Sequence, residues 1–288
     1  MKHLKSFQEN RPAVYLISTP IGNLDDITLR AINTLKAVDL IYAEDTRTSG
    51  VLLKHYDIKT PLVSYHAHNE KARLKPILNK LKEEKNIALI SDAGTPLISD
   101  PGQTLVKSLI EHDYPVISIP GPSAFLSALT VSGYTHPFLF YGFLPSKAPA
   151  RNQVLESMKT LPYTLIFYEA PHRLKETLES LKTVFISRDI TIARELTKLY
   201  EETIHLTLED IDQLPPLKGE LVLVVEGFTD ETPMDEKDLI DHIELLISDG
   251  LSEMDAIKAV AKARNMKKND VYMAYHTHKK YFKEDKGV

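Results

Sequence analysis

The chain has 288 residues, of which 43% are hydrophobic, and its formal net charge at pH 7 is −5. At about 150 residues per domain, this length predicts about two domains, each large enough for a sizeable core. Cysteine is absent, which excludes disulfides, thiolate nucleophiles and cysteine metal sites, and the negative charge excludes a basic field over the whole protein as a basis for nucleic-acid binding.

The N-terminus and the hydropathy pattern give no sign of export or of a membrane segment. Residues 1–12 are polar and lack the apolar core of a signal peptide. No apolar run approaches the roughly 20 residues that cross a bilayer. The lack of cysteine fits a reducing compartment, so we expect a soluble cytoplasmic protein without a membrane partner.

Short apolar runs alternate with helical patterns in the first half of the chain, which predicts a parallel sheet with right-handed crossovers. Asp25 or Asp26 is placed to cap the first helix, and the run from Glu44 to Gly50 is expected to be a charged loop. The expected strands are 13–18, 39–43, 61–65, 87–90 and 116–119, and the expected helices are 27–38, 51–56, 71–84 and 104–112.

The second half predicts another α/β domain, with a mixed sheet. Its expected strands are 138–143, 164–168, 190–194, 203–207 and 221–226, and its expected helices are 151–160 and 174–182. The fold class is therefore α/β, with two α/β domains at 13–121 and 122–228 and a helical extension at 235–288.

The extension follows a linker rich in proline, threonine and acidic residues and contains two or three expected helices, at 236–248, about 252–264 and about 268–278. Its charge is uneven. Residues 235–255 hold eight acidic residues and one lysine, whereas residues 258–286 hold nine basic and three acidic residues. The pattern resembles a helix-turn-helix that binds RNA, and the alternative is a small helical cap with a solvated charged face.

The stretch from Ile90 to Gly102, ISDAGTPLISDPG, follows an apolar run and precedes a helical pattern. Ligands of open α/β sheets lie outside the carboxyl ends of the strands. Gly94 lets a ligand approach the backbone closely, and Pro96 and Pro101 stiffen the loop. The alternative is an ordinary turn between a strand and a helix, but such turns usually have about 2 to 6 residues. The stretch therefore predicts a ligand loop.

Several common catalytic motifs are missing from the sequence. There is no G-x-G-x-x-G, no phosphate loop of the G-x-x-x-x-G-K-[ST] type, no H-E-x-x-H and no G-x-S-x-G. His66, His68 and Glu70 could form a metal cluster on paper, but we interpret them as surface residues or substrate contacts. We predict no metal site.

The loops that close the strands carry the motifs VYLISTPIGNLDDITLRA, EDTR, SDAGTPLISDPG, IPGPSA, FYEAPHR and ARELTK. These motifs resemble those of the tetrapyrrole methylase superfamily of S-adenosylmethionine enzymes. Within it they resemble the branch that methylates the 2′ oxygen of a cytidine ribose in the decoding region of bacterial 16S rRNA. The resemblance implies S-adenosylmethionine in a cleft between two α/β domains, a homodimer, and 16S rRNA or the small ribosomal subunit as partner.

The chain departs from the wider superfamily in two of these motifs. The G-x-G-P-G of many relatives appears here as Ser18 to Gly22, and their G-D-P appears as Gly94-Thr95-Pro96. An acidic residue is therefore missing where many relatives place one. This departure argues against porphyrin methylation and agrees with the rRNA branch.

The resemblance also implies the residues that contact the cofactor. Backbone groups of Gly94, Thr95 and Ile98 are expected to meet it, and residues of the second domain are expected to close the cleft. The full expected set is Pro20, Ile21, Asp92, Gly94, Thr95, Ile98, Ser123, Ala124, Tyr168, Ala170 and Leu196.

A ribose hydroxyl is a poor nucleophile that needs alignment with the methyl group and a path for its proton. The candidate acceptors are Glu169, Asp45 and Asp100, and we expect Glu169 to act because it ends a buried strand. The alternative for Glu169 is an ion pair with Arg173, four residues further on.

Positive side chains on the loops and the extension are candidates for RNA phosphates. The alternative is surface ion pairing, with Glu44, Glu195 and Glu201 as partners. Two other functions stay open: methylation of a tetrapyrrole or another small molecule or protein side chain, and a non-catalytic role in RNA binding or ribosome assembly. The candidate RNA-binding residues are Arg47, His172, Arg173, Arg194, Lys198, Lys267 and Lys268.

Overall fold

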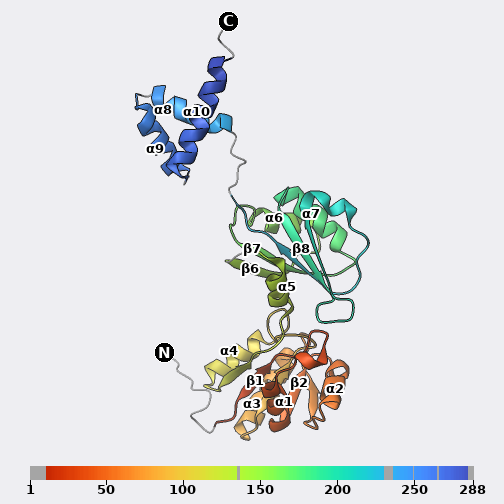
Figure 1. The fold of residues 1–288 in the computed structure, drawn as a ribbon. Coiled ribbons are helices and arrows are strands. Elements are labelled where there is room, and N and C mark those ends of the chain that lie inside the picture. Colours follow the sequence, from red (N-terminus) through yellow and green to blue (C-terminus); the bar gives the residue numbers. More distant parts are fainter. Residues whose placement is uncertain (1–10, 135–136, 230–235, 249, 265, 285–288) are drawn as a thin grey trace. The chain divides into compact units, whose positions relative to one another are not determined.

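The computed structural model describes residues 11–134, 137–229, 236–248, 250–264 and 266–284 (Figure 1). The chain forms two compact units, residues 1–228 and residues 229–288. Among the described residues, no helix combines the length and the apolar character that crossing a membrane requires.

The first sheet has five parallel strands in the order β3-β2-β4-β1-β5, which confirms the predicted parallel sheet. Both faces are covered by helices, so its strands are continuous apolar runs. Helices α1 and α2 pack on one face, and α3 and α4 pack on the other. The elements are β1 (Val14–Ile17), η1 (Leu24–Asp26), α1 (Leu29–Ala37), β2 (Leu40–Ala43), α2 (Thr46–His55), β3 (Leu62–Ser64), α3 (Glu70–Lys82), β4 (Ile87–Ile90), α4 (Gln103–Glu111) and β5 (Val116–Ile119).

The second sheet is mixed, as predicted, in the order β6-β7-β10-β8-β9. Only the β6–β7 pair is parallel. Helices α6 and α7 pack on one face, and α5 packs on the other, against β7, β8 and β10. The elements are α5 (Ala124–Ser132), β6 (Phe138–Phe143), α6 (Ala148–Glu156), β7 (Thr164–Glu169), α7 (Leu174–Phe185), β8 (Asp189–Arg194), β9 (Glu202–Thr207), η2 (Leu208–Gln213) and β10 (Leu221–Val225).

Helix α5 was not expected from the sequence. Its residues, AFLSALTVS, are apolar almost all round, so the polar–apolar period that signals a surface helix is weak. The end signal was present, because Gly133 ends the helix in the left-handed conformation at a φ of +77°. Since α5 packs on the second sheet, the proposed domain boundary after residue 121 falls between β5 and this helix.

Two local expectations around the first sheet are wrong. The run from Glu44 to Gly50 is not a loop throughout, because α2 begins at Thr46 and the Asp45 side chain accepts the Arg47 N–H at the start of the helix. Neither Asp25 nor Asp26 caps α1: both lie in the short η1 helix. Thr28 caps α1, and its side chain accepts the N–H of Ala31 at 3.1 Å.

The C-terminal unit contains three helices in its described part, α8 (Glu236–Ser248), α9 (Glu253–Ala263) and α10 (Lys268–Glu284). Their apolar faces meet in one small core that includes Ile243, Ile257 and Val271. The Ser252 side chain caps α9 by accepting the Asp255 N–H. The unit is therefore a helical bundle with its own core.

Candidate functional site

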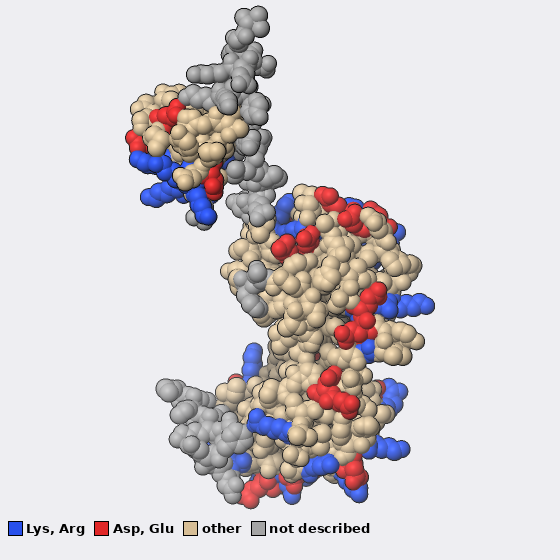
Figure 2. Space-filling model, in the orientation of Figure 1, with Lys and Arg blue, Asp and Glu red and all other residues tan. Residues whose placement is uncertain are grey.

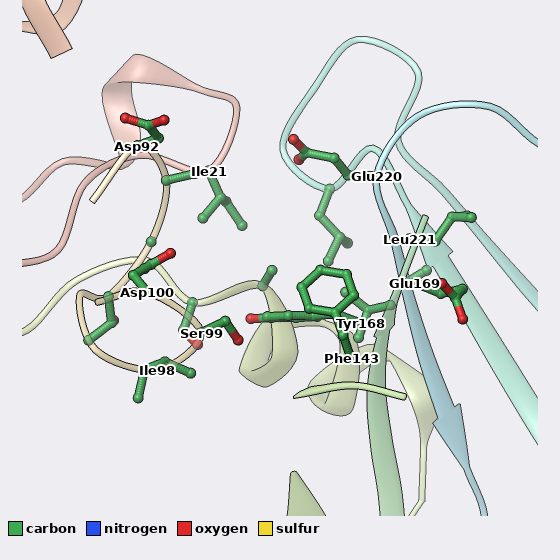
Figure 3. A pocket seen from close by; sticks show the side chains of 18 residues that line it. Ile21, Asp92, Ile98, Ser99, Asp100, Phe143, Tyr168, Glu169, Glu220 and Leu221 are labelled. Carbon is green, nitrogen blue, oxygen red and sulfur yellow. The ribbon is translucent and has the colours of Figure 1, made fainter. Parts of the chain in front are cut away.

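A cavity of about 310 Å³ lies within the first unit, between loops at the carboxyl ends of the first sheet and strands of the second sheet (Figure 3). Both α/β halves contribute to its wall. The expected cofactor residues that line it are Ile21, Asp92, Gly94, Thr95, Ile98, Ser123, Ala124, Tyr168 and Leu196. Pro20 and Ala170 are not among its lining residues.

The loops after β1 and β4 are joined by a short antiparallel bridge. The N–H of Thr19 donates to the carbonyl of Gly94 at 2.9 Å, and the N–H of Gly94 donates to the carbonyl of Thr19 at 3.0 Å. The Ser91 hydroxyl also donates to the Gly94 carbonyl at 3.2 Å, so both backbone groups of Gly94 have partners within the protein. Gly94 lines the cavity, and its contact with a cofactor stays a prediction. Because Gly94 has no side chain, it leaves space in the cavity. Its φ is +75°, a backbone conformation that residues with a side chain rarely adopt.

A set of hydroxyl groups fixes three of these loops to one another. The hydroxyl groups of Ser18 and Thr95 are 3.0 Å apart, and Thr95 also donates to the carbonyl of Pro122. Thr19 donates to the carbonyl of Ser91 at 3.1 Å. Thr95 therefore joins the loops through a neutral hydroxyl group.

The second sheet presents Tyr168 to the cavity, and Figure 3 shows its hydroxyl pointing toward the loop that carries Ser99 and Asp100. Burial raises the pKa of Tyr168. Phe143, at the end of β6, also lines the cavity and is 54% exposed. The second half of the chain thus supplies an aromatic wall.

Glu169 follows Tyr168 on β7, and successive side chains of a strand point to opposite faces. Glu169 is among the residues that line the cavity, but its side chain is completely buried, and Figure 3 shows its carboxylate pointing away from the centre of the cavity. Thr177 donates to one carboxylate oxygen, the N–H of Ala170 donates to the other at 2.8 Å, and Arg173 Nε lies 3.4 Å away. The geometry therefore matches the ion-pair alternative, because both carboxylate oxygens already have partners within the protein.

Asp100 and Glu169 are the candidate proton acceptors that line the cavity, and of the two only Asp100 is partly exposed. Burial raises the pKa of Asp100, and the charge of Asp92 raises it further. Burial, followed by Asp100 and Asp92, also raises the pKa of Glu44. The carboxylates of Glu44, Asp92 and Asp100 give this end of the first sheet a negative potential.

Asp45 has a different role. Hydrogen bonds from Arg47 lower its pKa to about 2, and it does not line the cavity. Its backbone N–H donates to Asp92 at 2.9 Å. Asp45 therefore organises the start of α2 instead of facing a ligand in this cavity.

Most of the predicted phosphate-binding side chains in the first unit have acidic partners. Lys198 lies 2.9 Å from Glu195 and 3.2 Å from Glu220. Arg194 lies 2.9 Å from Glu202. Surface ion pairing, the alternative for this group, therefore describes the observed contacts.

The other candidates divide by exposure. Arg47 pairs with Asp45 at 2.6 Å but keeps 89% of its side chain exposed, and His172 is also exposed. Arg173 donates to the carbonyl of Leu144 at 2.7 Å and is mostly covered. Lys267 and Lys268 are exposed in the C-terminal unit.

Some lining residues escaped the sequence reasoning. Glu220, Leu221 and Val222 enter the wall at the start of β10, a strand predicted from its apolar run without any functional signal. Gly219, directly before these residues, is the sequence signal that could have located this part of the wall. Its φ is +89°, and an added Cβ would collide with the side chain of Glu195, so the turn requires glycine. Glu195 in turn accepts the N–H of Glu220 at 3.0 Å, which joins this turn to the loop after β8.

Comparison with known proteins places this fold and cavity in a class. The sequence model of the tetrapyrrole (corrin/porphyrin) methylases matches residues 13–212. The chain belongs to this family and is a methyltransferase.

The particular relatives share a name. A protein of Halalkalibacterium halodurans named ribosomal RNA small subunit methyltransferase I is 46% identical, over 96% of this chain and 99% of its own length. The protein of that name from Bacillus subtilis is 47% identical, over 91% of this chain and 94% of its own. A Streptococcus pyogenes protein of the same name is 40% identical over 96% of this chain and 99% of its own.

Solved structures share the fold at low identity. A uroporphyrin-III-C-methyltransferase from Thermus thermophilus matches with a TM-score of 0.53 and 20% identity, covering 75% of this chain and 94% of its own. The methyltransferase CobJ matches with a TM-score of 0.58 and 19% identity, over the same shares of the two chains. At these identities the likeness supports the two-sheet architecture alone.

The contacts of Glu169 predict a structural effect for Glu169→Gln. The change removes the charge that faces Arg173, so we expect the free energy of unfolding to fall by roughly 1–3 kcal/mol, measured by urea denaturation. Glu202→Gln is the matched control, because Glu202 is half exposed and pairs with Arg194, and it should cost at most about 1 kcal/mol. Equal stability of Glu169→Gln and the wild type would show that the buried carboxylate does not hold β7 and α7 together.

Proposed function

We propose that this chain uses S-adenosylmethionine to methylate the 2′ oxygen of a cytidine ribose in the decoding region of 16S rRNA. The observation that carries the proposal is the cavity between the two sheets, whose wall joins the small-residue loop of Gly94 to the aromatic side chains of the second sheet. The relatives at 40–47% identity are named for small-subunit ribosomal RNA, which favours RNA over a small tetrapyrrole as substrate.

The residues around the cavity fit the proposed cofactor. S-adenosylmethionine supplies an electrophilic methyl group on a positively charged sulfur, and it carries a flat adenine. Asp92 and Asp100, with Glu44 close by, provide negative potential for a cation. Tyr168, Phe143 and Leu196 provide the apolar wall that a flat ring requires.

Asp100 is the residue that we assign to the proton of the ribose hydroxyl. Both Asp100 and Glu169 line the cavity, but the Glu169 carboxylate is completely buried and paired with Thr177 and the Ala170 N–H, whereas Asp100 is partly exposed. The raised pKa of Asp100 makes it a better acceptor than an exposed aspartate.

The C-terminal unit provides a basic surface for RNA. Its described lysines include Lys258, Lys262, Lys267 and Lys268, all exposed, and Figure 2 shows lysine and arginine side chains gathered on one side of this unit. A hydrogen bond from Ser252, a hydrogen bond from Lys258 at 3.1 Å and the charge of Lys268 lower the pKa of Asp255, so both lysines act on the same carboxylate. This cluster supports phosphate binding by α9, α10 and the turn between them.

An apolar surface on the second sheet supports a homodimer. Strand β6 lies at the edge of the second sheet, and its Phe138 and Tyr141 side chains are 37% and 39% exposed. On α5, Leu126 and Val131 are 46% and 45% exposed. Exposed apolar edge strands favour pairing with another chain. We propose that a second copy covers this surface.

The assignment of Asp100 predicts a kinetic signature. Under single turnover at saturating cofactor, Asp100→Asn should slow methylation of small ribosomal subunits by about 10²- to 10⁴-fold, because an amide cannot accept the proton. The wild-type rate should fall as the pH is lowered through the pKa of Asp100, which lies above its ordinary value of 3.8. Asp100→Asn should lack this acidic limb. If Asp100→Asn methylates at the wild-type rate, Asp100 does not accept the proton, and catalysis depends on the alignment of the ribose hydroxyl with the methyl group alone.

The basic cluster predicts a change in salt dependence. Changing Lys267 and Lys268 to alanine should weaken binding to a decoding-region RNA hairpin and reduce the slope of log K against log salt by about 0.7 to 0.9 for each phosphate that the protein no longer neutralises. Filter binding over a salt series measures this slope. Lys36→Ala, an exposed lysine on α1, is the control. An unchanged slope for the double variant would favour the helical-cap alternative.

The apolar edge predicts the oligomeric state. Sedimentation velocity at micromolar concentration should give twice the mass of one chain for the wild type, and Tyr141→Glu should shift it toward one chain because a charge would lie in the buried surface. A wild-type protein that sediments with the mass of one chain would contradict the proposed homodimer.

A further inference from the structure

A second cavity, of about 420 Å³, adjoins the first and shares Ile21, Asp92 and Ala93 with it. It is bounded by the loop after β1, the first turns of α2 and the start of the loop after β4. We propose that this cavity holds the target nucleoside, with its ribose toward the shared wall and its base against α2. The inference rests on the proposed function and names the site at which the substrate binds.

The chemistry of the wall suits a nucleoside. Pro20, Leu24 and Leu52 provide apolar surface, and Thr48 and Ser49 add hydroxyl groups along one side. A base that has left its stack needs an apolar face to pack on and polar groups at its edge. The cavity offers both within one helix and one loop.

Ser49 provides an independent sign of a missing partner. Its side chain lines the second cavity and is 4% exposed, yet its hydroxyl has no hydrogen-bond partner. Buried polar groups are nearly always hydrogen-bonded, so an unpaired one points to an absent ligand. Rotation of this hydroxyl would let it bond the polar edge of a base or a ribose oxygen.

The first turn of α2 also carries the guanidinium group of Arg47, which Asp45 holds in place. Arg47 precedes Thr48 in the chain, and its Nε and Nη2 contact Asp45 at 2.6–3.2 Å. Asp45 in turn accepts the Arg47 backbone N–H and donates its own N–H to Asp92. The contacts hold an exposed guanidinium beside the cavity, where a phosphate next to the target nucleoside can pair with it. The EDTR motif thereby gains a role in substrate binding.

The shared wall explains how the two cavities serve one reaction. On transfer, the ribose 2′ oxygen forms the new bond to the methyl carbon, and the methyl–sulfur bond breaks with its electron pair going to sulfur. The hydroxyl proton goes to Asp100, which faces the first cavity. When a nucleoside binds in the second cavity, its ribose reaches past Ile21 toward the first cavity, where the cofactor binds. Its base stays in the second cavity.

Val51 allows a test that preserves the fold. It lines the second cavity but is 65% exposed, so Val51→Glu should fold normally while placing a charge against the base. Leu29→Glu is the matched control, since Leu29 is 80% exposed on α1 and lines neither cavity. The probes are S-adenosylmethionine and small ribosomal subunits purified from a strain that lacks this enzyme.

We expect Val51→Glu to raise the KM for subunits at least 10-fold while the Kd for S-adenosylmethionine, measured by calorimetry, stays within 2-fold of the wild type. Ser49→Ala should raise the same KM about 2- to 10-fold, because the change removes one hydrogen bond. Leu29→Glu should match the wild type in both measurements, and thermal denaturation checks that all variants fold.

Two results would overturn the inference while the wild type methylates the subunits. One is an unchanged KM in Val51→Glu, and the other is a weakened cofactor affinity, which would assign the second cavity to the cofactor. A wild-type chain that leaves the subunits unmethylated would instead remove the proposed function, and the nucleoside site with it.

Discussion

The pairing of Thr19 with Gly94 is the contact on which both cavities depend. It joins the loops after β1 and β4, and these loops supply the wall that the two cavities share. The pairing is possible because parallel strands end at the same edge of a sheet, which brings loops distant in sequence together. A positive φ at Gly94 completes the turn, so a glycine is required there by the backbone, and the cavity benefits from the space it leaves.

Charge is distributed unequally around this shared wall. Carboxylates gather on the first-sheet side, whereas the second sheet contributes aromatic and aliphatic groups. Thr95 joins the loops at this wall through a neutral hydroxyl group. The arrangement suits a cation on one side of the cavity and a flat ring on the other.

Much of the fold was predictable because buried parallel strands are continuous apolar runs between turn residues, as Ile87–Ile90 illustrates. Helix α5 was missed because it is apolar almost all round. The orientation of Glu169 could have been predicted from the period of two along β7, since Phe167 lies in the core under α7 and Glu169 shares its face. The ion partners of Arg194 and Lys198 could not, because they depend on how β8 pairs with β9 and on the turn before β10.

The most direct measurement is a map of ribose methylation on 16S rRNA. Small subunits from a strain that lacks the enzyme would be incubated with the purified chain and S-adenosylmethionine, and the rRNA analysed by mass spectrometry of nuclease fragments. The account predicts one new 2′-O-methyl group, on a cytidine in the decoding region, only when both protein and cofactor are added. A methyl group on a base, or no new methyl group on the rRNA, would contradict it.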